Sequence, residues 1–207
     1  MTVWLASWPR SGNTHFRMLV KHYFGLETGS AHADKVFSYG ELKSIVGHAP
    51  KSNVLVKTHR YHTDKLPAIY LVRDGRQACL SYWHHLRGHG GKQSLQDVIR
   101  GKTDFGAWSD HVLFWLKRVP EPTIVKFEEV LGKDDPAFLR EVLASVGIFK
   151  EPITSEPPPS FQSLHERNPR FFRSGRTDEW REVYGPDDLE LFNKLNGRTM
   201  AALGYMI

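Results

Sequence analysis

The chain has 207 residues, 40% of them hydrophobic and 25% charged, which is typical of one globular domain over residues 1–207 and disfavours a second domain. Its 28 basic and 23 acidic residues give a net charge of +5, which suits an anionic ligand without marking a basic tail. Cys79 is the only cysteine, so an internal disulfide is excluded, and its apolar neighbours predict a buried thiol. Because the sequence has neither a basic leader nor an apolar run of 18 residues, we expect a soluble, cytoplasmic protein without a membrane partner.

The first two predicted elements enclose a polar turn. Val3–Ala6 is a short apolar run that predicts a buried strand, and Thr14–Phe24 has apolar residues at helical spacing. Between them lie Arg10, Ser11 and Gly12. A strand, a tight turn and a helix point backbone N–H groups at an anion, and the helix N-terminus adds partial positive charge. The pattern therefore predicts a phosphate or sulfate site, with a simply capped helix as the alternative.

The rest of the chain alternates between strands and helices. The stretch Gly25–Pro50 predicts a connection with a short helix over Tyr39–Val46, and the proline-rich piece Glu151–Ser160 predicts an extended linker. Further strands are predicted at Val54–Val56, Ala68–Val72 and Thr123–Phe127, and further helices at Gly75–His85, Ser94–Arg100, Trp108–Val119, Asp135–Val146 and Asp187–Leu203. This alternation predicts an α/β three-layer sandwich, in which a central, mainly parallel sheet of about four to five strands has helices on both faces.

Basic side chains and one histidine follow the ends of three predicted strands. They are Arg10, Lys57, His59 and Arg73. Ligands of open α/β sheets bind at the carboxyl ends of the strands, so we expect these side chains on one rim of the sheet. The Walker sequence Gly-x-x-x-x-Gly-Lys-Ser/Thr is absent, which disfavours an ATPase or a kinase. A P-loop-like phosphotransferase stays an alternative, as does a nucleic-acid-binding module, although the sequence lacks the interleaved aromatic and basic residues of RNA-binding proteins.

Four separated segments match known motifs in the right order. They are Trp8-Pro9-Arg10-Ser11-Gly12-Asn13-Thr14-His15, Lys57-Thr58-His59, Tyr70-Leu71-Val72-Arg73-Asp74-Gly75-Arg76 with Ser81-Tyr82, and Phe172-Arg173-Ser174-Gly175-Arg176-Thr177-Asp178-Glu179-Trp180. They resemble the 5′-phosphosulfate loop, the Lys-Thr-His segment, the 3′-phosphate segment and the late Arg-Lys-Gly-x-x-Gly-Asp-Trp motif of the cytosolic-type sulfotransferase family. The resemblance implies a P-loop NTPase-like fold. It also implies transfer of a sulfuryl group from 3′-phosphoadenosine 5′-phosphosulfate (PAPS) to a hydroxyl, or an amine, of a small-molecule acceptor.

The catalytic residues implied by the resemblance are three. His59 would be the general base that removes the acceptor proton, Lys57 would face the sulfuryl oxygens, and Arg10 would take the place of the loop lysine on the leaving 5′-phosphate. Histidine suits this role because its ordinary pKa of about 6.5 leaves much of it neutral near pH 7. Since the protein supplies the cations, no metal is required.

A larger set is implied for binding PAPS. It consists of Arg10, Ser11, Gly12, Asn13, Thr14, His15, Arg73, Ser81, Phe127, Phe161, Arg173, Ser174 and Gly175. Within this set Arg73, Ser81 and Arg173 would hold the 3′-phosphate. Phe161 follows a serine, as in the family's Ser-Phe pair that contacts adenine, and Phe127 opens a segment that resembles the family's Tyr-Glu-Asp.

The sequence departs from the family pattern at three of these positions. Arg10 replaces a lysine, which keeps the charge but spreads it over a planar fork that can clamp phosphate. His15 replaces a tryptophan that stacks on adenine, and Ser174 replaces a lysine, which removes one cation. Asp178 is expected to pair with a nearby arginine rather than to take part in the chemistry.

The residues that contact the acceptor are predicted less directly. The candidates are Trp83, His84, Trp108 and His111, and the alternative places Trp108 in the core and His111 on the surface. His84, His85 and His89 suggest a metal site, but no carboxylate or cysteine nearby completes a set of ligands. We therefore predict no metal and no nucleic-acid partner, and a protein that is a monomer or a homodimer.

Overall fold

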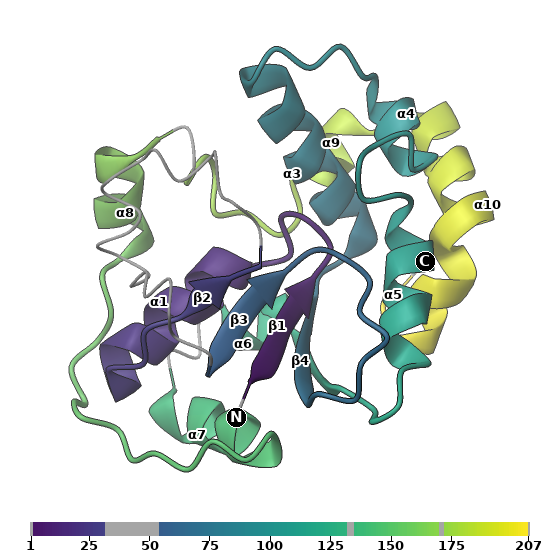
Figure 1. The fold of residues 1–207 in the computed structure, drawn as a ribbon. Helices are drawn as coiled ribbons and strands as arrows, with labels where there is room; N and C mark the ends of the chain where they lie inside the picture. The colour runs from purple at the N-terminus through teal and green to yellow at the C-terminus, as the bar shows by residue number, and fades with distance from the viewer. Residues whose placement is uncertain (1, 32–53, 132–134, 170–171, 207) are drawn as a thin grey trace. The chain divides into compact units, whose positions relative to one another are not determined.

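The structure, a computed structural model, describes residues 2–31, 54–131, 135–169 and 172–206 (Figure 1). It divides the chain into two compact units, each assembled from three segments. The sheet unit comprises Met1–Ser7, Gly12–Val72 and Arg118–Pro159, and the helical unit comprises Trp8–Ser11, Arg73–Lys117 and Ser160–Ile207. The single domain expected over residues 1–207 stays a prediction.

The sheet unit holds a five-stranded parallel sheet in the order β2-β3-β1-β4-β5. The strands are β1 (Val3–Ser7), β2 (Gly29–Ser30), β3 (Leu55–Thr58), β4 (Ala68–Val72) and β5 (Thr123–Lys126). Leu5 of β1 lies opposite Lys57 of β3 and Ile69 of β4. Every residue of β4 is buried, as the strands of a parallel sheet covered on both faces require. The predicted α/β class with a central parallel sheet is confirmed.

The helices α1 (Asn13–Phe24), α6 (Phe127–Val130) and α7 (Pro136–Ser145) belong to the sheet unit. α1 contacts β1 and buries the apolar stripe that predicted it, which includes Phe16, Leu19 and Val20. It ends at Gly25, whose φ of 60° is left-handed and whose N–H donates to the carbonyl oxygen of Lys21. Glycine is the usual residue at such a helix end because it has no Cβ to clash.

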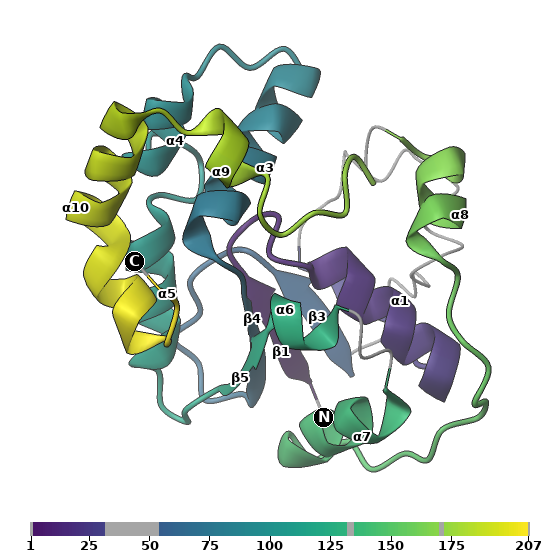
Figure 2. The same ribbon diagram turned by 180° about the vertical axis from the view of Figure 1, so that it is seen from behind.

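The helical unit contains α3 (Gly75–Gly88), α4 (Leu95–Ile99), α5 (Trp108–Leu116), α8 (Phe161–Arg167), α9 (Trp180–Val183) and α10 (Pro186–Ala202). Figures 1 and 2 both show α10 beside α4 and α5. The ring of Trp108 is fully buried and lies so close to Gly75 that a Cβ at Gly75 would stand 2.9 Å from Trp108 Cδ2. Ser109 Oγ donates a buried hydrogen bond of 2.7 Å to Asn196 Oδ1 and so joins α5 to α10.

Most of the predicted elements are present, with shifted ends. α5 ends at Leu116 rather than at Val119, because Pro120 disfavours helical geometry at the residue before it. β5 ends one residue early because Phe127 begins α6. β2, α6, α8 and α9 were not predicted, since elements of two to seven residues carry too little periodicity. The helix predicted over Tyr39–Val46 lies outside the described residues.

None of the helices in the described ranges is both long and apolar enough to cross a membrane.

Candidate active site

The turn after β1 contributes Arg10 and Ser11 to the helical unit. Arg10 has a φ of 65°, in the left-handed region that costs a residue with a side chain about 1–2 kcal/mol. Two hydrogen bonds hold it there: Arg10 Nε donates to Ser81 Oγ at 3.2 Å, and Arg73 Nη1 donates to the Arg10 carbonyl oxygen at 3.2 Å. Ser11 Oγ is buried and has no hydrogen-bond partner among the residues that the structure describes.

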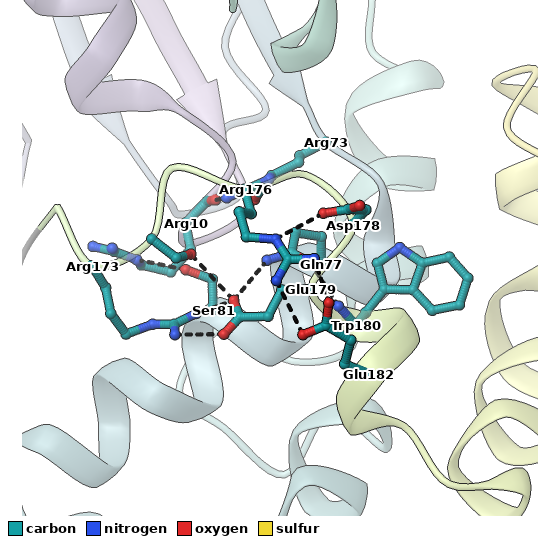
Figure 3. Close-up of polar contacts among 11 residues, drawn as sticks. Arg10, Arg73, Gln77, Ser81, Arg173, Arg176, Asp178, Glu179, Trp180 and Glu182 are labelled. Carbon is teal, nitrogen blue, oxygen red and sulfur yellow. Dashed lines mark hydrogen bonds and ion pairs between the residues drawn. The ribbon is translucent and has the colours of Figure 1, made fainter. Parts of the chain in front are cut away.

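The turn residue Arg10 lies near Arg73 and Arg173, and all three belong to the helical unit (Figure 3). The pKa of Arg10 is lowered to about 10, mainly by burial and further by the positive charges of Arg73 and Arg173. Arg73 is itself buried, and its Nη2 donates to the carbonyl oxygen of Arg176 at 2.8 Å. Like charges in a poorly solvated place repel one another, so this cluster favours an anion among them. Arginine N–H donors suit phosphate and sulfate oxygens in particular.

Glu179 organises the late motif and was not recognised from the sequence. Arg173 Nη1 donates to Glu179 Oε1 at 2.6 Å, and Arg173 Nη2 pairs with Oε2. Gln77 Nε2 of α3 donates to Oε2 at 3.4 Å (Figure 3). Ser174 Oγ also donates to Oε2, at 3.2 Å. The hydrogen bond from Arg173 is the main reason that the pKa of Glu179 is lowered to about 2. The signal in the sequence for this role was the acidic residue directly before Trp180 in the late motif.

Arg176 forms further ion pairs in this segment, one of which was predicted from the sequence. Asp178 Oδ1 accepts a hydrogen bond of 3.1 Å from Arg176 Nε, which confirms the prediction that Asp178 pairs with an arginine. Glu182 also binds the Arg176 guanidinium, with oxygens at 2.6 and 3.0 Å. Asp74, at the start of α3, forms a buried pair with Arg76 at 2.6 Å.

The sheet unit carries His59 and Lys57 at the carboxyl end of β3. His59 Nδ1 lies 2.7 Å from the carbonyl oxygen of Ser7, the last residue of β1, and 3.3 Å from Ser7 Oγ. A carbonyl oxygen can only accept, so in the neutral ring Nδ1 carries the hydrogen and Nε2 carries the lone pair. This tautomer is the one in which Nε2 can accept a proton. Lys57 is half-buried two residues earlier, opposite Leu5.

Aromatic rings pack against glycines of two predicted binding segments. In the sheet unit, a Cβ on Gly12 would lie 2.2 Å from Phe127 Cδ2, and the Phe127 ring meets His15 edge-on at 6.0 Å. In the helical unit, a Cβ on Gly175 would lie 2.9 Å from the half-exposed ring of Phe161. Both glycines have positive φ. Each ring therefore sits where only a residue without a side chain leaves room for it.

The candidate acceptor residues differ in their exposure. Trp83 is half-buried and donates from Nε1 to the carbonyl oxygen of Gln93 at 3.1 Å. His84 is half-buried as well, and burial and the charge of Arg173 lower its pKa. Trp108 and His111 are fully buried, so the alternative that places His111 on the surface is wrong. Contact of these four residues with an acceptor stays a prediction.

Two further expectations concern metals and Cys79. No group of three or more potential metal-ligating side chains occurs within the described ranges, which include His84, His85 and His89. Cys79 is fully buried in α3, as its apolar neighbours predict, and burial raises the pKa of its thiol.

The family model of the sulfotransferase domain matches residues 2–137. A WSCD family member from Aedes aegypti is 33% identical over 156 residues, which cover 67% of this chain and 48% of that protein. Sulfotransferase 1C2 from Homo sapiens is 24% identical over 159 residues, which cover 64% and 54% of the two chains. The chain thus spans about half the length of these curated relatives.

The fold is also similar to that of a solved sulfotransferase. Mouse sulfotransferase SULT7A1, whose structure is complexed with PAP, superposes with a TM-score of 0.66 and 20% identity over 96% of this chain and 84% of that one. A likeness at this identity establishes the shared fold, and the family match covers more than half of the sequence. The chain therefore belongs to the sulfotransferase domain family.

Proposed function

We propose that this protein is a PAPS-dependent sulfotransferase that transfers a sulfuryl group to a hydroxyl, or an amine, of a small-molecule acceptor. The observation that carries the proposal is the arginine cluster of Arg10, Arg73 and Arg173, in which the neighbouring charges help to lower the pKa of Arg10. Family membership and the PAP complex of SULT7A1 support the same assignment.

The residues of the helical unit suit a phosphorylated nucleotide. Glu179 accepts hydrogen bonds from Arg173, and Arg73 donates to the backbone carbonyl oxygens of Arg10 and Arg176. The buried Ser11 hydroxyl lacks a hydrogen-bond partner within the described part of the chain and can donate to a phosphate oxygen. We assign Arg10 and Ser11 to the 5′-phosphate, and Arg73, Ser81 and Arg173 to the 3′-phosphate.

The remaining residues of the predicted set are assigned to other parts of PAPS. Asn13 and Thr14 open α1, whose N-terminus favours negative charge. Phe127, His15 and Phe161 offer aromatic surface to the adenine, and Gly12, Ser174 and Gly175 offer backbone N–H groups. When bound, PAPS supplies the sulfuryl group and its 5′-phosphate is the leaving group. Because protein cations supply the positive charge, the proposal includes no metal.

His59 carries the proton transfer in this proposal. Its Nε2 lone pair accepts the proton of the acceptor hydroxyl, while Nδ1–H donates to the Ser7 carbonyl oxygen. That hydrogen bond holds the ring in one orientation and stabilises the imidazolium that forms. Lys57 is assigned to the sulfuryl oxygens, where its ammonium group stabilises the charge that develops during transfer.

Calorimetry and a transfer assay test the proposal. We expect PAP to bind without Mg²⁺, and labelled sulfate to pass from PAPS to members of a panel of phenols, alcohols and amines. The His59→Ala variant should lose transfer and keep PAP binding, whereas Arg73→Lys should weaken PAP binding about tenfold or more because it loses a two-pronged donor. Binding of ATP with Mg²⁺ and no binding of PAP would instead favour a phosphotransferase. Wild-type transfer rates in the His59→Ala variant would remove His59 from the mechanism.

The cytoplasmic location is part of the same proposal. A single cysteine, buried in α3, suits a reducing compartment.

A further inference from the structure

The side chain of Asn13 ties the start of α1 to the end of β1. Asn13 is buried, and its Nδ2 donates to the carbonyl oxygen of Leu5 at 3.1 Å and to Ser7 Oγ at 3.3 Å. An amide nitrogen has two hydrogens, so both are used. Leu5 and Ser7 are alternate residues of β1, and Ser7 is its last. Asn13 therefore anchors the strand at the point where the sheet ladder ends.

The same residue Ser7 determines the tautomer of His59. If Nδ1 carried a lone pair, that lone pair would face the lone pairs of the Ser7 carbonyl oxygen across 2.7 Å, which is unfavourable. The Ser7 hydroxyl, 3.3 Å from Nδ1, could donate to it and favour the opposite tautomer. The balance depends on where the Ser7 peptide and side chain are held, and Asn13 contacts that side chain directly.

We infer that Asn13 is a positioning residue that fixes the tautomer and orientation of His59 through Ser7. The catalytic consequence rests on the proposed function, but the effect on the imidazole does not. A mobile Ser7 carbonyl would release Nδ1–H, and the ring would shift toward the tautomer that carries its hydrogen on Nε2. In that form Nε2 cannot accept a proton.

The carbonyl oxygen of the Asn13 side chain is evidence against a purely structural role for this residue. Asn13 Oδ1 is buried and has no hydrogen-bond partner among the described residues. A buried acceptor without a partner destabilises the folded state, so a residue selected only for stability would avoid it. A threonine at position 13 would have one hydrogen-bond donor and no buried carbonyl oxygen. It would therefore lose one of the two hydrogen bonds that Asn13 donates to β1.

Variants at Asn13 and a matched control test the inference. Asn13→Ala removes both hydrogen bonds, and Asn13→Thr keeps a single donor and removes the carbonyl oxygen. Asn196→Ala is the control, because Asn196 is also a buried asparagine and its side chain accepts a hydrogen bond from Ser109 in the helical unit. Each protein is labelled with ¹⁵N, and the histidine side-chain spectrum, assigned with His59→Gln, reports which ring nitrogen carries the hydrogen.

In the wild type and in Asn196→Ala we expect neutral His59 to carry its hydrogen on Nδ1. In Asn13→Ala we expect a mixture of tautomers and a fall in kcat of up to about 100-fold. Asn13→Thr should melt no lower than the wild type and still lose part of kcat, a combination that loss of stability alone would not produce. It also keeps the test decisive if the alanine variant does not fold.

Two results overturn the inference: an unchanged His59 tautomer in a folded Asn13 variant, or an equal change in Asn196→Ala. A wild type that neither binds PAP nor transfers sulfate would refute the proposed function instead. The tautomer spectra would still decide the role of Asn13 in that case, because they need no substrate.

Discussion

The ion pair between Glu179 and Arg173 predicts how stability changes in acid. The pKa of Glu179 falls from its ordinary 4.5 to about 2 in the folded protein. A carboxylate with a lowered folded-state pKa stabilises the fold above its unfolded pKa, and this stabilisation is lost as the pH falls through its folded pKa. The difference of 4.5 − 2 corresponds to about 3 kcal/mol at 1.36 kcal/mol per pH unit. Because the Arg173 side chain is 34% exposed, solvent screening reduces the expected contribution to about 2 kcal/mol.

The substitution Glu179→Gln isolates this contribution. The amide keeps the shape of the side chain and can still bond Ser174 and Gln77, but it cannot titrate. Urea unfolding from pH 7 to pH 2 should show a loss of about 2 kcal/mol more in the wild type than in the variant, and the difference should develop below about pH 4.5.

Glu182→Gln is the matched control for this experiment. Glu182 also binds an arginine through two oxygens, but both side chains of that pair are largely exposed. Exposed pairs contribute little, so the control should follow the pH dependence of the wild type. If Glu179→Gln and the wild type lose stability in parallel down to pH 2, the Arg173–Glu179 pair does not hold the late motif as described.

Two further predictions concern the packing of the fold. Gly12→Ala should lower the free energy of unfolding by more than about 2 kcal/mol, because the new Cβ would lie 2.2 Å from Phe127 Cδ2 and the φ of this residue is 93°. Gly88→Ala is the control, because a Cβ at Gly88 would have no atom within 4 Å. Equal urea midpoints for the two variants would contradict the packing of Phe127 on Gly12. Cys79 should react with a thiol reagent such as DTNB only when the protein unfolds, because its thiol is fully buried and burial raises its pKa. Stoichiometric labelling of Cys79 within seconds in native buffer would contradict this prediction.

The sequence identified the segments of the candidate site, but not which side chains within them bind one another. The late motif drew attention to Arg173 and to Asp178, and the latter does pair with an arginine. The carboxylate that faces Arg173 is Glu179, one residue further along, which also receives Gln77 from α3, 102 residues earlier in the chain. Sequence spacing cannot decide between adjacent carboxylates, because the choice depends on the direction in which the backbone turns before α9.

What the sequence determined by itself is local. Runs such as Ala68–Val72 are apolar throughout, which is typical of a strand in a parallel sheet that is covered on both faces. The apolar spacing in α1 and the glycine at its end are equally local signals. They were sufficient for the fold class and for the order of its main elements.

Only the tertiary structure decided the states of the side chains. His59 owes its tautomer to the carbonyl oxygen of Ser7, 52 residues earlier, which is near only because β1 and β3 are neighbours in the sheet. The lowered pKa of Arg10 likewise requires Arg73 and Arg173 nearby, and these come from segments far apart in the chain. Protonation depends on desolvation and on distances between charges, and both are set when separate segments pack together rather than by the order of residues along one of them.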